Sequence, residues 1–269
     1  MISILSKITR LYKTTPYIYN KFLLLKLNLF IVINKKSIKI IKSLHFKKYR
    51  DKHNLFLVEG EKCVDELIKS NYEIQSIYST KKTLQKYSKY DINEISEDDL
   101  GKISSQVNPN NILAIVKTRY NKIKYSDGIT LILDGINNPG NLGTIIRTCD
   151  WFGIKNIVCS NNTVDVFNPK VVQSTMGSIF RVNIFYTDLI KYLKKVKYPI
   201  YAATLDGINL SRQKFPSNLY LILGNESNGI NDSLLDLVDT KIKIEKQGKA
   251  ESLNVGIASA IFLHKILFC

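Results

Sequence analysis

Residues 130–149, which decide the fold, read Thr130-Leu131-Ile132-Leu133-Asp134-Gly135-Ile136-Asn137-Asn138-Pro139-Gly140-Asn141-Leu142-Gly143-Thr144-Ile145-Ile146-Arg147-Thr148-Cys149. Three of the first four residues are apolar, and the four together predict a strand. Pro139 then fixes the entry to a turn, and Gly140 and Gly143 let the backbone pass close to a neighbour. From Leu142 the pattern predicts a helix, so a strand, a loop and a helix follow one another directly.

Arg147 is expected near the start of this helix. A cation is unusual there, because the free amides of the first turn already carry partial positive charge. An arginine in such a place usually serves an anionic partner. The alternative is an ordinary surface arginine, and the stretch alone leaves both open.

Composition and charge narrow the class of protein. The chain has 269 residues, 45% hydrophobic and 23% charged, which is typical of a globular protein with room for two modest domains. Its net charge of +16 favours a polyanionic partner, nucleic acid ahead of an anionic membrane. The four cysteines lack C-x-x-C spacing and the three histidines are scattered. We therefore expect no metal site, and a reducing, cytoplasmic location for free thiols.

Residues 1–36 contain no acidic residue and include the apolar run Phe22–Ile33. At about a dozen residues, this run is shorter than the roughly 20 needed to cross a bilayer, so no stable membrane association is expected. We interpret residues 1–36 as an N-terminal extension of unknown role. A basic, acid-poor segment also fits an organellar transit peptide, which would place the protein in an organelle.

Residues 37–117 alternate between predicted helices and strands. A basic helix runs through Lys48, and strands are then expected at residues 55–58, 74–78, 92–95 and 112–116, with helices at 61–69, 81–89 and 97–105. This spacing predicts a small, mostly parallel α/β layer. The polar residues 118–128 are interpreted as a linker.

Residues 129–269 repeat the alternation and form the second predicted domain. Its strand at 219–223 is apolar on both faces, so it is expected to be buried, with a polar loop at its carboxyl end where open α/β sheets bind ligands. The last helix, from Ser252 through Leu267, has small residues on one side and is expected to pack closely. Ser252 is the predicted N-cap.

Three polar loops, each after a buried strand, remain as the candidate site: residues 137–143, 224–230 and 247–254. Neither the glycine pattern of a dinucleotide site nor that of a phosphate-binding loop occurs in the sequence, and no Ser-His-Asp arrangement is present.

Taken in order, the three loops resemble the three motifs of the SpoU, or TrmH, class of RNA ribose 2′-O-methyltransferases in the SPOUT superfamily. Asn138-Pro139-Gly140-Asn141-Leu142-Gly143-Thr144-Ile145-Ile146-Arg147-Thr148 resembles motif 1, Leu223-Gly224-Asn225-Glu226-Ser227-Asn228-Gly229-Ile230 resembles motif 2, and Ile244 through Ser252-Leu253-Asn254-Val255 resembles motif 3. Residues 37–117 resemble the L30e-like substrate-binding domain that precedes many of these enzymes. Residues 1–36 lie outside the resemblance.

The resemblance implies an α/β fold with an N-terminal L30e-like domain and a C-terminal SPOUT methyltransferase domain. In that domain a deep trefoil knot, with the last helix threaded through a loop, holds S-adenosyl-L-methionine. General folding rules would not predict a knot, since knots are rare. The resemblance also implies a homodimer through the C-terminal domain, in which Arg147 lies near the partner's cofactor.

Eight residues match functional positions of the family. The expected contacts to the methyl donor, mostly through main-chain groups, are Gly224, Ile244 and Leu253, and the expected catalytic residues are Arg147, Asn141, Glu226, Ser252 and Asn254. For Ser252 and Asn141, helix capping or loop bonding is the strongest alternative. Arg147 matches the position to which the family assigns removal of the hydroxyl proton. Because a guanidinium is effectively always protonated, we expect it instead to hold the target phosphate and hydroxyl.

The implied activity is methyl transfer to a ribose 2′-hydroxyl of RNA, with large-subunit (23S-type) rRNA as the expected substrate, because the short tRNA enzymes of the family carry helical extensions in place of the first domain. The alternatives are a tRNA ribose 2′-O-methyltransferase and a non-catalytic RNA-binding homologue. The latter would be expected to have lost the motif residues, and all are present. The basic residues expected to contact RNA phosphates are Lys39, Lys42, Lys47, Lys48 and Arg50.

Overall fold

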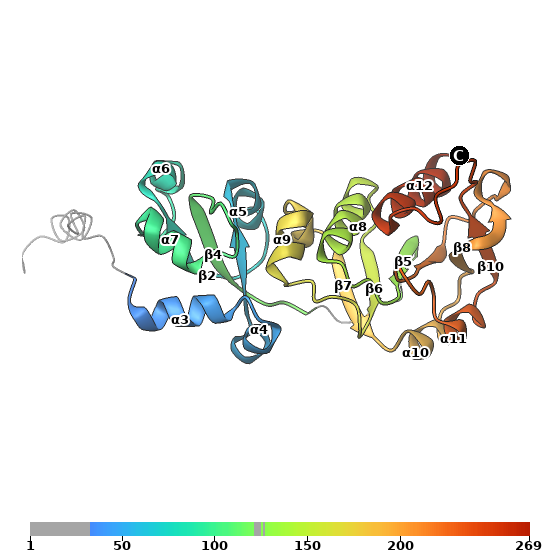
Figure 1. Ribbon diagram of the computed structural model, residues 1–269, viewed down its shortest axis with the longest axis horizontal. Coiled ribbons are helices and arrows are strands. Elements are labelled where there is room, and N and C mark those ends of the chain that lie inside the picture. The colour runs from blue at the N-terminus through green and yellow to red at the C-terminus, as the bar shows by residue number, and fades with distance from the viewer. Residues whose placement is uncertain (1–32, 121–124, 126) are drawn as a thin grey trace, which may run out of the picture.

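The structure of the chain is a computed structural model that describes residues 33–120, 125 and 127–269. Two lobes lie side by side, each built on one sheet, with helix α9 between them (Figure 1). Our interpretation of residues 1–36 falls outside the described residues except at 33–36. No helix among the described residues is long and apolar enough to cross a membrane.

The N-terminal lobe has a four-stranded sheet in the order β1-β4-β2-β3. Its elements are α3 (Lys35–Ser43), α4 (Lys47–His53), β1 (Leu55–Glu59), α5 (Glu61–Ile68), β2 (Ile74–Ser79), α6 (Lys81–Leu84), the 3-10 turn η1 (Gln85–Tyr87), β3 (Ile92–Glu94), α7 (Glu97–Ile103) and β4 (Ile112–Lys117). The expected alternation is present, and the α/β class is confirmed.

The direction of the strands in this lobe was predicted wrongly. Strand β4 lies between β1 and β2 and runs antiparallel to both, and only β2 and β3 are parallel. Alternating strands and helices do not fix direction by themselves. Residues 104–111, which follow α7, return the chain to the sheet so that β4 enters antiparallel between its neighbours.

The basic helix predicted through Lys48 is two helices, α3 and α4. At the break, Leu44 is fully buried in the cluster that also holds Ile41, and the carbonyls of Leu44 and His45 accept hydrogen bonds from Arg50. Helix α4 ends at Asn54, whose left-handed conformation (φ 53°) stops the helix and starts β1.

The C-terminal lobe has a six-stranded, all-parallel sheet in the order β10-β8-β9-β5-β6-β7. Its strands are β5 (Ile129–Leu133), β6 (Asn156–Ser160), β7 (Asn183–Thr187), β8 (Ile200–Asn209), β9 (Leu219–Leu223) and β10 (Thr240–Lys243). Its helices are α8 (Pro139–Trp151), α9 (Pro169–Thr175), α10 (Leu189–Leu193), α11 (Asp232–Leu235) and α12 (Val255–Phe268), with the 3-10 turns η2 (Ser178–Phe180) and η3 (Leu210–Arg212).

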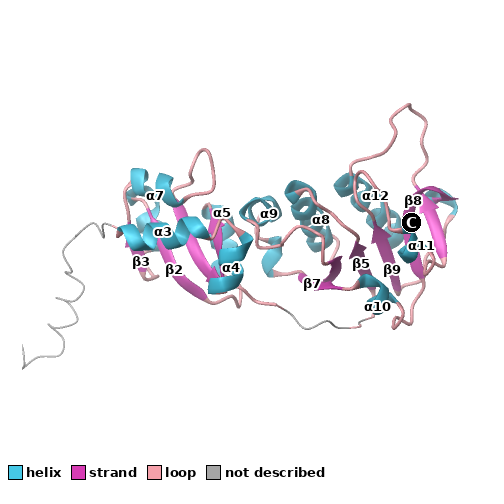
Figure 2. Cartoon of the chain, turned by 60° about the horizontal axis from the view of Figure 1, so that its bottom comes forward, coloured by secondary structure: helices cyan, strands magenta, loops and turns pink. Residues whose placement is uncertain are grey.

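Helices cover both faces of this sheet, with α8, α9 and α12 on one side and α10 and α11 on the other (Figures 1 and 2). The strand β5 shows why the sheet needs both layers. Leu131 and Leu133 pack into the cluster below α8 and α12, whereas Ile132 faces the cluster below α10 and α11. A strand with apolar side chains on both faces therefore becomes a buried central strand.

Two helices begin elsewhere than predicted. Helix α8 starts at Pro139, and Asn138 caps it by accepting hydrogen bonds from the amides of Gly140 (2.8 Å) and Asn141 (3.2 Å). Arg147 therefore lies in the third turn, beyond the partial charge of the helix start, so our argument from that charge was wrong. Helix α12 is capped by Asn254 and not by Ser252.

A buried ion pair joins the two lobes. The Nε and Nη2 atoms of Arg50 donate to one carboxylate oxygen of Asp165 at 3.0 and 2.6 Å, and Nη1 donates to the carbonyls of Leu44 and His45. The two side chains are only 3% and 9% exposed. Arg50 was expected to contact RNA phosphates, and this was wrong, because its donors are occupied inside the protein.

Apolar packing continues across the same boundary. The ring of Phe56 in β1 lies 4.6 Å from that of Phe167, just before α9, and Tyr72 lies 5.2 Å from Phe180. One hydrophobic cluster includes residues of both sheets. The lobes therefore share a core, which fixes their relative position.

We predict that Asp165→Asn lowers the free energy of unfolding by on the order of 3 kcal/mol, because it leaves the buried guanidinium of Arg50 without its counter-charge. Urea unfolding measures the loss. The matched control is Lys47→Ala, which breaks the exposed Lys47–Asp51 pair and should cost at most about 1 kcal/mol. Equal losses in the two variants would contradict the role given to the buried pair.

Candidate active site

The three candidate loops leave the sheet at the carboxyl ends of β5, β9 and β10. Because β5 and β9 are parallel neighbours in register, the loops after Leu133 and Leu223 start side by side. The third loop follows β10 at the edge of the sheet and returns to the centre, where α12 packs against α8. The sheet thus places the three motifs on one side of the molecule, at the carboxyl ends of its strands.

Hydrogen bonds tie the first two loops together. The side-chain amide of Asn225 donates to the carbonyl of Gly135 at 2.6 Å, and the amide of Asn231 donates to the carboxylate of Asp134 at 2.9 Å. Sequence reasoning missed Asn225 and Asp134, although Asp134 directly follows β5 and Asn225 is the second residue after β9. The two loops therefore behave as one structural unit.

A chain of side-chain hydrogen bonds joins all three loops. Glu226 accepts from the Nδ2 atom of Asn141 at 2.7 Å, and the Oδ1 atom of Asn141 accepts from Nδ2 of Asn254 at 2.9 Å. The Oδ1 atom of Asn254 accepts the amides of Gly256 and Ile257 at the start of α12. Three predicted site residues from three separate motifs are thus in direct contact.

Arg147 and Ser252 do not join this chain. Arg147 is exposed on α8, and among the described residues it has neither a hydrogen bond nor an ion pair. It lines a surface cavity of about 480 Å³ together with Asp150, Trp151 and Arg181. Ser252 is exposed in the third loop and, in the described part of the chain, bonds to no other residue.

The second loop is built from main-chain groups. Asn225 and Gly229 bond to each other through both amides and carbonyls, at 2.8 and 3.0 Å, and the side chain of Asn225 accepts the amides of Ser227 and Asn228. A Cβ atom on Gly224 would lie 2.3 Å from the carbonyl carbon of Gly229. Only glycine fits there, because the opposing atoms belong to the backbone.

The expected contacts to the methyl donor come from two segments: Gly224 lies in the second loop, and Ile244 and Leu253 lie between β10 and α12. Gly224 and Ile244 are partly buried, and Leu253 is 48% exposed. These two segments offer neutral main-chain groups and two apolar side chains, and the second loop adds the carboxylate of Glu226. This set fits S-adenosylmethionine, which offers an adenine to apolar and main-chain groups and carries a cationic sulfonium.

The buried cysteines do not offer an alternative nucleophile. Burial raises the pKa of the Cys63 thiol to about 11 and raises the pKa values of Cys149 and Cys159 as well. These thiols stay protonated at neutral pH, so they are not activated nucleophiles. Within the described residues, no three His, Cys, Asp or Glu side chains gather as a metal site would require.

Comparisons with known proteins match both lobes of the chain. A family model described as the SpoU rRNA methylase family matches residues 128–264, and one described as the MRM3-like substrate binding domain matches residues 35–114. A curated relative from Bacillus subtilis strain 168, 23S rRNA (guanosine(2553)-2′-O)-methyltransferase RlmP, is 32% identical over 245 residues, covering 86% of this chain and 96% of the relative.

Solved structures give the same result. A putative RNA methyltransferase of the TrmH family from Porphyromonas gingivalis is 34% identical with a TM-score of 0.78, over 86% of this chain and 97% of that one. An AdoMet-bound rRNA methyltransferase from Sinorhizobium meliloti is 28% identical with a TM-score of 0.79, over 86% and 94% of the two chains. The likeness spans both lobes.

We predict that Gly224→Ala opens the second loop, because its Cβ atom would displace the backbone of Gly229. Hydrogen exchange of the Asn225 and Gly229 amides, which bond across the loop, should then become at least about tenfold faster. The control is Gly248→Ala, since a Cβ atom there meets nothing within 4 Å. Unchanged exchange in Gly224→Ala would refute the steric argument.

Proposed function

The chain belongs to the SpoU rRNA methylase family, and from that premise we propose that it transfers a methyl group from S-adenosyl-L-methionine to a ribose 2′-hydroxyl of large-subunit rRNA. The observation that carries the proposal is the hydrogen-bonded chain Glu226–Asn141–Asn254, which joins the three family motifs at one edge of the sheet.

The substrate class is supported by the extent of the similarity. A named 23S rRNA ribose methyltransferase matches this chain over both lobes, including the substrate-binding one. The tRNA enzyme and the non-catalytic homologue are not favoured, because the first lobe is present and every motif residue is retained. For location we propose the cytoplasm, with an organelle as the alternative if residues 1–36 act as a transit peptide.

The cofactor supplies an activated methyl group, and its sulfonium charge is quenched on transfer. The chain therefore has to hold the ribose oxygen in line with the methyl group that it attacks. Gly224, Ile244 and Leu253 would hold the cofactor, with Glu226 as the nearby carboxylate. Asn141 and Asn254 keep the loops in register, and Ser252, which is exposed, would offer its hydroxyl to the RNA.

In this proposal Arg147 acts on the RNA and not on the cofactor loops of its own chain. Its guanidinium is exposed and is not engaged by the described residues, so its planar fork is available to a phosphate and the adjoining hydroxyl. It lies six residues after Asn141 on α8, and the cavity that it lines includes none of Asn141, Glu226 and Asn254. We infer that Arg147 completes the site of a second copy.

The surface of α8 and α12 supports a homodimer. These two helices pack together, and they leave large apolar side chains exposed, at Trp151 (85%), Ile257 (55%), Ile261 (38%) and Phe268 (67%). Apolar surface of this kind marks an interaction site. A two-fold contact there would place Arg147, one turn from Trp151, against the partner.

RNA docking is assigned to the lysines of the first lobe. Lys39, Lys42 and Lys48 are exposed and lack an ion pair within the described part of the chain, and Lys47 bonds to Asp51. They lie on α3 and α4 and can add phosphate contacts that do not depend on sequence. Arg50 is not among them, because it is buried.

We predict that Arg147→Ala lowers methyl transfer by on the order of 100-fold, since the charge that holds the target is lost, while S-adenosylmethionine affinity stays unchanged. Arg147→Lys should not restore the rate, because one ammonium cannot replace the planar fork. Transfer of labelled methyl to unmodified 23S rRNA transcript and calorimetric binding measure the two effects. Arg119→Ala is the control, and a fully active lysine variant would refute this role.

We predict a homodimer that Trp151→Glu converts to a monomer, because a carboxylate would be buried in an apolar contact. Light scattering measures the mass of each variant. Val107→Glu, which changes a side chain 97% exposed on the other lobe, should leave the dimer intact. A wild-type monomer at working concentration would contradict the shared site.

A further inference from the structure

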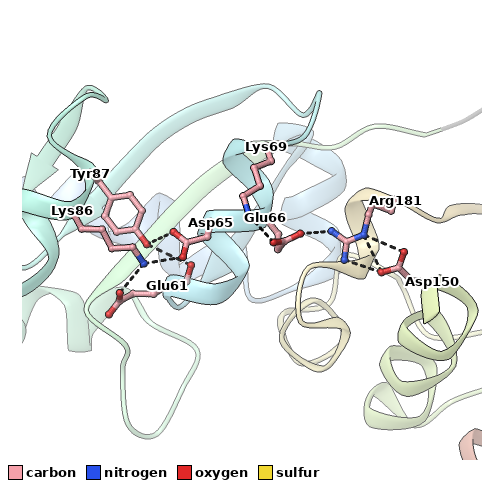
Figure 3. Close-up of polar contacts among 8 residues, drawn as sticks. All are labelled: Glu61, Asp65, Glu66, Lys69, Lys86, Tyr87, Asp150 and Arg181. Carbon is pink, nitrogen blue, oxygen red and sulfur yellow. Dashed lines mark hydrogen bonds and ion pairs between the residues drawn. The ribbon is translucent and has the colours of Figure 1, made fainter.

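Arg181, just after η2, bridges the two lobes beside Arg147. Its Nε atom donates to both carboxylate oxygens of Asp150 at 3.1 and 3.0 Å, and its Nη2 atom donates to Oδ2 at 2.8 Å. Its Nη1 atom donates to Glu66 of α5 in the other lobe. Figure 3 shows the guanidinium lying between the two carboxylates.

Asp150 is a potential partner of Arg147. The two residues lie three apart on α8, a spacing at which side chains of a helix meet, and both line the same cavity. Yet the carboxylate of Asp150 is filled by the three bonds from Arg181 and by one from Ser178 at 2.8 Å. Arg147, by contrast, has no ion pair among the described residues.

Asp150 stays charged at neutral pH. Its burial raises the pKa, but hydrogen bonds from Arg181 and Ser178, with the charge of Arg181, lower it below the ordinary value overall. A permanent negative charge thus lies about one turn from the arginine that is to meet RNA. Without Arg181, that charge would attract Arg147 and repel phosphate.

A role in holding the two lobes together does not explain the hydrogen bonds of Arg181. The buried Arg50–Asp165 pair already joins them, whereas the side chain of Arg181 is 45% exposed, and pairs at such sites contribute little to stability. Moreover, three of the four bonds from Arg181 go to Asp150 in its own lobe. Arg181 therefore uses most of its hydrogen bonds on Asp150.

We propose that Arg181 is a positioning residue for methyl transfer: by occupying Asp150 it leaves the guanidinium of Arg147 free for RNA. Because Arg181 also bonds to Glu66, its position over Asp150 depends on contact with the N-terminal, substrate-binding lobe. The inference rests on the proposed function, because it assumes that Arg147 acts on RNA.

The test is a suppression experiment with two double variants of equal net charge. Arg181→Gln should lower both methyl transfer and the affinity for 23S rRNA transcript by about 2- to 5-fold, as expected when an exposed ion pair competes with RNA for Arg147. Adding Asp150→Asn should restore both values. Adding Glu66→Gln should not, although it restores the same net charge, because Glu66 lies on α5 and keeps its ion pair with Lys69 when Arg181 is lost.

A second readout separates positioning from structure. The slope of log RNA affinity against log salt concentration should fall by the equivalent of about one phosphate contact in Arg181→Gln and in its Glu66→Gln double variant. Adding Asp150→Asn should restore the slope. Thermal unfolding should be alike in the two double variants, because both lack the bridging arginine.

The inference is overturned if Asp150→Asn fails to restore RNA affinity and its salt slope, or if Glu66→Gln restores them equally. Failure of the proposed function has a different signature, since the wild-type protein would then not methylate 23S rRNA at all. In that case the salt slopes of RNA binding still decide whether Arg181 keeps Arg147 free.

Discussion

The return of α12 from the edge of the sheet to its centre is the constraint on which the site depends. The chain leaves β10 at the edge and must bring Asn254 to Asn141, so α12 has to lie directly on α8. That contact needs a small residue, since a Cβ atom on Gly256 would already lie 3.0 Å from Thr144. The side chain of Asn254 then both caps α12 and binds the first loop. A helix start and an active-site contact are therefore one interaction, and the trefoil knot that the family resemblance implies stays a prediction for this return path.

The surroundings of each arginine decide whether it stabilises the fold or is available to the substrate. Arg50 is buried, its donors are spent on Asp165 and two carbonyls, and it holds the lobes together. Arg181 is half-exposed and occupies carboxylates of both lobes. Arg147 is exposed, and no described residue engages it. The positive charge of the chain is thus not one uniform surface for RNA, and the lysines of α3 and α4 supply a separate, exposed part of it.

The sequence predicted the positions of the main strands and loops better than it predicted strand direction and burial. The apolar strands at 130–133 and 219–223 and the three loops were predicted at the right places, and the family resemblance was confirmed. Two errors share a cause, which is that tertiary context decides between local alternatives. The pattern could not show that β4 inserts antiparallel, or that Arg50 of a basic helix is buried. The early start of α8 was readable, because asparagine before proline is a common helix beginning, but Leu142 was taken as the first residue.

The buried pair between the lobes also restricts how such proteins can be recombined in evolution. Its halves come from opposite sides of residues 118–128, Arg50 from one lobe and Asp165 from the other. A chimaera joined there, with a substrate lobe from a relative that lacks the arginine, would enclose the carboxylate of Asp165 without a counter-charge, at a cost of several kcal/mol. The two lobes are therefore expected to be inherited together, and exchange of substrate specificity between relatives would proceed by changes on the exposed face of the first lobe and not by replacing it whole.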